Sequence, residues 1–239
     1  MPDYYIPEIP KSPRIDRLVS HLFEQMPQIE TDRAVLLTEA YKKSEGKPVI
    51  TRRAEAFAHI MENLPITIRP EELIVGSNTL RPRSCQVFPE YSFAWLEDEL
   101  DTVETRAADP FYISEENKQI LREVYKYWGG KTTSELAEEY MSDGAKMAMK
   151  HNIFTPGNYF YNGIGHITVD YIKVLKVGFG GIIREAVEEL DACKPYMAEY
   201  AKKHEFLESV IISADAAIQY AKRYSRLAAE MAAKCTDNR

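Results

Sequence analysis

Apolar residues recur every three or four positions along most of this 239-residue chain, which is the spacing of amphipathic helices. Residues 14–25 place apolar side chains on one face and are followed by Pro27, which ends a helix. Ser114 precedes another such segment and Gly46 follows a third, as helix caps do. The pattern predicts helices over residues 14–25, 31–46, 51–65, 96–106, 115–128, 133–151, 170–190 and 205–234.

The remaining segments have a different pattern. Residues 66–75 alternate and contain Pro70, which predicts short extended pieces, and residues 81–89 indicate a loop. Residues 1–13 hold four prolines and predict an extended lead-in. Because no linker divides residues 14–239, the sequence indicates a mainly α fold in one helical unit. The last helix has no glycine cap or proline stop, so we expect its apolar face to need a partner and the unit to be incomplete at its C-terminal end.

Composition narrows the class of protein. The chain is 45% hydrophobic and 28% charged, which is ordinary for a globular protein. Its formal net charge of -7 and its lack of a basic run argue against nucleic acid as a partner. Three cysteines do not form a disulfide framework, and the N-terminus does not resemble a secretory signal. No apolar run approaches the roughly 20 residues that span a bilayer, so we expect a cytoplasmic protein without a membrane partner.

The strongest candidate for a site is the run GNYFYNGIGHITVD at residues 157–170, which lies just before a predicted helix. Its three glycines allow backbone to approach a ligand closely, and His166 stands between Gly165 and an isoleucine. Asn158 and Tyr161 are further candidate substrate contacts in the same run. A tight turn with a structural histidine is the alternative. Asp170 fits the N-cap of the next helix better than a general base.

Other charged groups give weaker signals. Arg81 and Arg83 flank a proline, which is compatible with an anion clamp but more typical of a structural corner. The other histidines show no ligand spacing, so no metal site is predicted. The glycines at 157, 163 and 165 have the wrong spacing for a phosphate-binding loop and lack its lysine.

Several blocks beyond the glycine-rich run resemble one family in the same order. The chain is similar to the N-terminal part of the glycyl radical enzymes of the pyruvate formate-lyase family, in the branch of B12-independent glycerol and diol dehydratases. The resemblance extends from about Arg14 to the end of the chain. It is carried by DRAVLLTEAYK (32–42), RRA (52–54), PITIR (65–69), ELIVG (72–76), PRS (82–84), FPE (88–90), LEDELD (96–101), WGGKTT (128–133) and the run at 157–170.

The resemblance implies a fold, a chemistry and a set of partners. The family fold is a ten-stranded β/α barrel wrapped in helices, usually a homodimer, of which this chain would supply the N-terminal helices and one wall of the pocket. A radical-SAM activase installs the glycyl radical, a cysteine thiyl abstracts hydrogen from a small polyol, and water leaves. The matching histidine hydrogen-bonds a substrate hydroxyl, which here would be His166, beside Asn158 and Tyr161.

The same resemblance shows what this sequence lacks. The Gly-Cys-Val-Glu-like cysteine loop and the Arg-Val-x-Gly-Tyr-like radical loop do not occur, and none of the three cysteines has a matching setting. We therefore expect no catalytic residue and no bound cofactor in this chain, and no activity from it alone. Two alternatives stay open: another branch, of the pyruvate formate-lyase, isethionate lyase or choline lyase type, or a non-catalytic helical interaction module.

Overall fold

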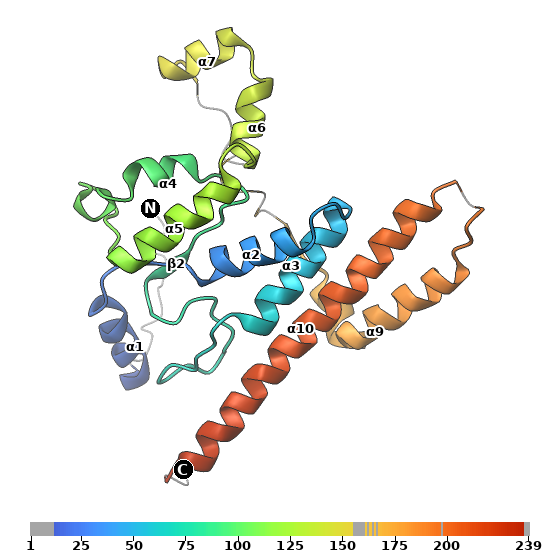
Figure 1. The fold of residues 1–239 in the computed structure, drawn as a ribbon. Helices are drawn as coiled ribbons and strands as arrows, with labels where there is room; N and C mark the ends of the chain where they lie inside the picture. Colours follow the sequence, from blue (N-terminus) through green and yellow to red (C-terminus); the bar gives the residue numbers. More distant parts are fainter. Residues whose placement is uncertain are drawn as a thin grey trace, which may run out of the picture.

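The computed structural model describes residues 12–154, 161, 163, 165, 167–196 and 198–236. Helices dominate this part of the chain, which confirms the mainly α prediction (Figure 1). The elements are α1 (Pro13–Phe23), β1 (Gln28–Glu30), α2 (Asp32–Lys43), α3 (Val49–Asn63), β2 (Ser84–Gln86), α4 (Ala94–Glu99), η1 (Val103–Thr105), α5 (Glu115–Trp128), α6 (Thr133–Tyr140), α7 (Asp143–Lys150), α9 (Tyr171–Ala192) and α10 (Tyr200–Lys234).

The hydrophobic core lies where α2, α3 and α5 meet the segment that includes α4. Phe93, Leu100 and Leu121 are fully buried there, among other apolar side chains of these elements. The indole Nε1 of Trp128 donates a 2.8 Å hydrogen bond to the hydroxyl of Thr38, so the buried ring at the end of α5 is tied to α2. Burial of these side chains provides the main stabilisation of this half of the molecule.

A second packing unit is formed by α3, α9 and α10, which lie side by side in Figure 1. The long helix α10, drawn in red, runs beside both α3 and α9. Much of the apolar face of α10 is therefore covered within this chain, with Leu207, Ala214 and Tyr224 buried. Phe206 remains 53% exposed on the same helix.

Two predicted helices are interrupted. The predicted helix over 96–106 is wrong beyond Glu99, because α4 ends there and a 3-10 turn follows. The hydroxyls of Thr102 and Thr105 each bond a carbonyl three residues back, which competes with helix continuation. The predicted helix over 133–151 divides into α6 and α7, since the side chain of Ser142 accepts from the amide N–H of Ala145 and starts a new helix.

Three further segments differ from the secondary structure that the hydrophobic pattern predicts. The segment predicted as a loop at 81–89 contains β2, which pairs in parallel with β1. The extended pieces predicted at 66–75 form neither strand nor helix in the structure. The predicted helix over 170–190 exists as α9 but bends at Gly178, whose φ of 64° and ψ of 176° are not helical. Asp170 caps α9 as predicted, accepting a 3.0 Å hydrogen bond from the amide of Lys173.

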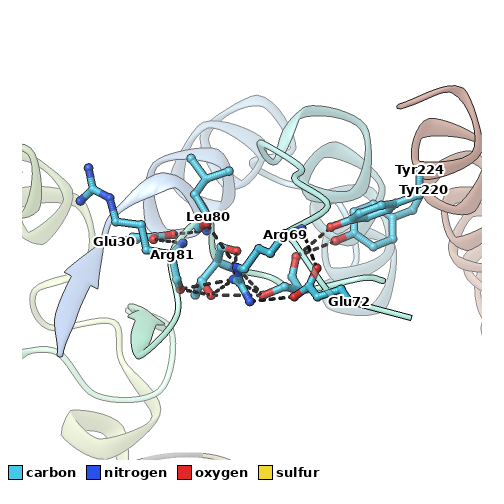
Figure 2. A network of polar contacts seen from close by, with 9 residues as sticks. Glu30, Arg69, Glu72, Leu80, Arg81, Tyr220 and Tyr224 are labelled. Carbon is cyan, nitrogen blue, oxygen red and sulfur yellow. Dashed lines mark hydrogen bonds and ion pairs between the residues drawn. The ribbon is translucent and has the colours of Figure 1, made fainter. Parts of the chain in front are cut away.

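A segment without regular structure, residues 64–83, crosses between the two packing units and is held by side chains (Figure 2). Arg69 is its centre: one guanidinium nitrogen contacts the Glu72 carboxylate at 3.1 Å and another donates to the Thr79 carbonyl at 2.6 Å. From α10, Tyr220 and Tyr224 each donate a 3.2 Å hydrogen bond to the carbonyl of residue 77. The segment is thus tied to α10 through polar contacts.

Candidate functional site

The glycine-rich run is only partly within the described residues. His166 and Asn158, two of the predicted substrate contacts, lie outside them. Tyr161 is described, and its ring is 37% exposed. Its hydroxyl donates a 3.4 Å hydrogen bond to the carboxylate of Glu138 on α6. Partial burial, followed by the Glu138 charge, raises the pKa of Tyr161, so the phenol stays protonated near neutral pH.

Gly163 contacts Tyr91 so closely that only glycine fits. A Cβ atom at position 163 would lie 2.7 Å from two ring carbons of Tyr91 and 3.1 Å from its hydroxyl oxygen. The backbone of Gly163 also has φ of 69°, in the left-handed region that side chains rarely adopt. Two independent requirements therefore favour glycine here, and the first of them places Gly163 against the segment that contains Tyr91.

Tyr91 also faces a cavity of about 400 Å³ between α2, α3 and residues 78–91. Phe57, Met61 and Leu64 provide apolar wall, and Arg33 with Glu90 provides the polar part. The cavity is within the usual size range of small-molecule sites, with few polar groups among apolar ones. Tyr91 thus lines this cavity and also lies against Gly163 of the glycine-rich run.

The polar groups of the cavity are engaged with one another. The guanidinium of Arg33 makes two contacts with the Glu90 carboxylate, at 2.5 and 3.1 Å, and both side chains are mostly buried. The same guanidinium lies 3.7 Å above the centroid of the Phe88 ring. A guanidinium that is paired and stacked in this way fixes the segment 88–90 to α2 and is not free to bind an anion.

The arginines at 81 and 83 form a structural corner. Arg81 donates a 2.5 Å hydrogen bond to the side-chain oxygen of Gln28, and Arg83 donates to the carbonyl of Gln25. The guanidinium of Arg83 also lies over the ring of Phe23. Each therefore attaches the chain around β2 to the chain from α1 to β1, as a structural corner does.

The cysteines have ordinary settings. Cys85 lies in β2, and partial burial followed by the Glu30 charge raises the pKa of its thiol, so it is not an activated thiolate. Cys193 is buried after α9 and Cys235 follows α10. Among the described residues there is no cluster of three potential metal ligands. Within the same residues, no helix combines the length and the apolar character needed to cross a bilayer.

The contacts of Tyr91 and Glu138 with the glycine-rich run did not follow from the sequence. Tyr91 stands 72 positions before Gly163, and neither residue carries a spacing pattern that links them. The available signal is indirect: Tyr91 follows the FPE block at 88–90, one of the blocks that carry the family resemblance.

Comparison with known proteins places this geometry in a family. Residues 7–239 match the family described as pyruvate formate lyase-like. A solved structure described for 1,2-propanediol dehydration in Roseburia inulinivorans is 58% identical, with a TM-score of 0.92 over 96% of this chain and 29% of that one. The glycerol-bound B12-independent glycerol dehydratase of Clostridium butyricum is 52% identical, with a TM-score of 0.91 over 95% of this chain and 29% of that one.

A more distant relative among characterised proteins is the (2S)-3-sulfopropanediol dehydratase of Klebsiella oxytoca, which is 35% identical over 93% of this chain and 28% of its own length. The chain thus spans less than a third of the length of the relatives it matches. Its fold matches the corresponding part of the two solved structures over at least 95% of this chain. The chain therefore belongs to the pyruvate formate lyase-like family of glycyl radical enzymes.

Proposed function

We propose that this chain is the N-terminal, substrate-binding region of a glycyl radical dehydratase acting on a small 1,2-diol such as glycerol or 1,2-propanediol. The observation that carries the proposal is the 58% and 52% identity to structures described for those two substrates. Identity to the sulfopropanediol dehydratase is 35% over nearly the same residues. The higher sequence identity to the proteins described for neutral diols favours a neutral diol over a sulfonate as the substrate.

The residues of this chain would bind and orient the diol. His166 would hydrogen-bond one substrate hydroxyl, because an imidazole can donate or accept a proton near neutral pH as water departs. Asn158 and Tyr161 would contact the same substrate. The hydrogen-abstracting chemistry would come from a glycyl radical, installed by a radical-SAM activase, acting through a cysteine thiyl. Both of these groups and most of the barrel would lie outside this chain, in a cytoplasmic homodimer.

The test uses the complete, activated enzyme. His166→Ala should lower kcat/KM for glycerol and 1,2-propanediol by about a hundredfold, because a general acid or base contributes roughly that much. His151→Ala is the matched control, since His151 is an exposed residue at the end of α7. Normal turnover and normal substrate affinity in the His166 variant would refute the proposed role of this histidine.

The mass of the native polypeptide distinguishes the enzyme from a non-catalytic helical module, and a substrate panel distinguishes the branches of the family. An intact mass well above 27.4 kDa for the polypeptide in its native source supports the enzyme, whereas a mass of 27.4 kDa supports a non-catalytic helical module. A substrate panel of glycerol, 1,2-propanediol, 3-sulfopropanediol and isethionate separates the branches. Turnover of a sulfonate in preference to either neutral diol would assign the enzyme to another branch of the family.

A further inference from the structure

We infer that Tyr91 is a positioning residue for the glycine-rich run, which its ring contacts at Gly163. The inference rests on the proposed function, because it assumes that the run binds substrate. Its starting point is the contact between Tyr91 and Gly163, which leaves no room for a Cβ atom. Gly163 precedes His166 by three positions, so a displacement at Gly163 has little chain in which to be absorbed.

Tyr91 can act as a fixed support because its own backbone is held from two directions. Its carbonyl accepts a 2.9 Å hydrogen bond from the amide of Ser134, in the first turn of α6. Its amide donates to the carbonyl of Phe88 at 3.2 Å. The neighbouring Glu90 carbonyl accepts a 3.1 Å hydrogen bond from the amide of Thr133. The backbone at 90–91 is therefore joined to the beginning of α6.

The other support comes from α2. Arg33 holds the Glu90 carboxylate with two contacts and stacks on Phe88, so two of the three residues just before Tyr91 are attached to α2. A paired and mostly buried guanidinium loses little freedom when it makes these bonds. Tyr91 therefore projects from a rigid segment between α2 and α6, as a side chain that positions a site should.

A second contact ties the same run to the same helix. The hydroxyl of Tyr161 donates to Glu138, which lies on α6 one turn beyond its capping box. Thr132 and Glu135 form that capping box, which fixes the start of α6. The glycine-rich run is thus supported at positions 161 and 163 by residues that depend on α6.

The experiment compares two variants in the complete, activated enzyme. Tyr91→Phe keeps the ring that meets Gly163 and removes only the hydroxyl, so kcat/KM should stay within about twofold of the parent value. Tyr91→Ala removes the ring, and kcat/KM should fall by about tenfold to a hundredfold, since a small misplacement of substrate has an effect of that size. The ratio of kcat/KM for glycerol to that for 1,2-propanediol should change as well, by about fivefold.

Loss of folded or radical-loaded enzyme lowers the measured activity on both substrates equally and leaves the ratio of the two kcat/KM values unchanged. A changed ratio therefore distinguishes a positioning role from a purely structural one. Radical content and the unfolding temperature are measured on every variant. If Tyr91→Ala does not fold, Tyr91→Leu replaces it, because leucine keeps apolar volume without the flat ring. Gly163→Ala should reproduce the loss, and combining it with Tyr91→Ala should cost less than the sum of the two single changes.

The outcomes separate the two proposals. Parental kcat/KM and parental substrate ratio in folded, radical-loaded Tyr91→Ala or Tyr91→Leu enzyme would overturn the positioning role, provided that His166→Ala is impaired. Parental activity in His166→Ala as well would instead overturn the proposed function on which this inference rests. Impaired His166→Ala and Tyr91→Ala with a normal Tyr91→Phe supports both.

Discussion

The carboxylate of Glu30 holds the chain between residues 80 and 86, and its removal gives the sharpest test of the structure. Glu30 ends β1 and is 7% exposed. One carboxylate oxygen accepts from the amide of Arg81 at 3.1 Å, and the other accepts from the amide of Leu80 at 3.0 Å (Figure 2). The second oxygen also accepts from the side-chain nitrogen of Gln86 at 3.2 Å.

Glu30→Gln changes the hydrogen bonding without changing the shape. Either orientation of the new amide turns an NH2 group toward a backbone N–H, because each carboxylate oxygen already accepts from one. One hydrogen bond to a charged acceptor is lost, which costs roughly 1.5–3 kcal/mol, and the remaining ones lose the negative charge. Since the Leu80 and Arg81 contacts are only partly buried, water offsets some of this cost. We expect a net local destabilisation of about 2 kcal/mol.

Hydrogen exchange measures this effect locally. A loss of about 2 kcal/mol should make the amides of Leu80 and Arg81 exchange about thirtyfold faster in the complete enzyme. Glu45→Gln is the matched control, because Glu45 is exposed in the turn after α2 and should leave these amides unchanged. Unchanged exchange at Leu80 and Arg81 in the Glu30 variant would refute the inference that this carboxylate holds the segment.

Three further changes test other parts of the molecule. Leu121→Ala should lower the free energy of unfolding by about 2–5 kcal/mol, because Leu121 is fully buried. Leu136→Ala should have little effect, because Leu136 is 54% exposed. Equal urea midpoints for the two variants would contradict this prediction. Arg223→Lys cannot keep both hydrogen bonds from α10 to the end of α3, so the melting temperature should fall; an unchanged one would contradict the contact. Burial raises the pKa of Glu135, but hydrogen bonds from Thr132 and nearby amides outweigh it and leave that pKa lowered. The stabilisation from the ionised Glu135 carboxylate is therefore present above about pH 4 and is lost as pH falls through the folded-state pKa. Thr132→Val should weaken this loss of stability when the free energy of unfolding is measured against pH. An unchanged decrease of stability at low pH would contradict the role given to Thr132.

The sequence predicted elements well where a cap coincides with the hydrophobic pattern. The helix at 115–128 has the predicted bounds, because the Ser114 side chain accepts from the amide of Asn117 and Gly129 follows its last residue. Prediction from the sequence failed where a helix-capping residue lies inside a continuous apolar pattern. Ser142 looks like a tolerated helix residue in sequence, yet it caps a new helix, since its side chain satisfies an amide that continuation of α6 would have used.

The candidate site was predictable only in part. The glycine-rich run and the cap at Asp170 have local signals, namely residue type and position before an apolar pattern. The cavity beside Tyr91 and the contact with Gly163 join segments that are distant in sequence, and their geometry depends on how α2, α3 and α6 pack. The spacing of apolar residues predicts which residues share one face of a helix or strand, and it does not predict contacts between distant segments.

The segment 64–83 shows why periodicity is a poor guide to order. Several of its backbone groups bond to side chains and not to a neighbouring strand, so the alternation at 66–75 does not correspond to a strand. Arg69 alone donates to several groups of the segment, and Tyr220 with Tyr224 joins it to α10. The segment therefore links the core around α2 to the packing of α3 and α10. Arg69 and α10 meet at one residue of the segment, because Arg69 donates to the hydroxyl of Ser77 while Tyr220 and Tyr224 donate to its carbonyl.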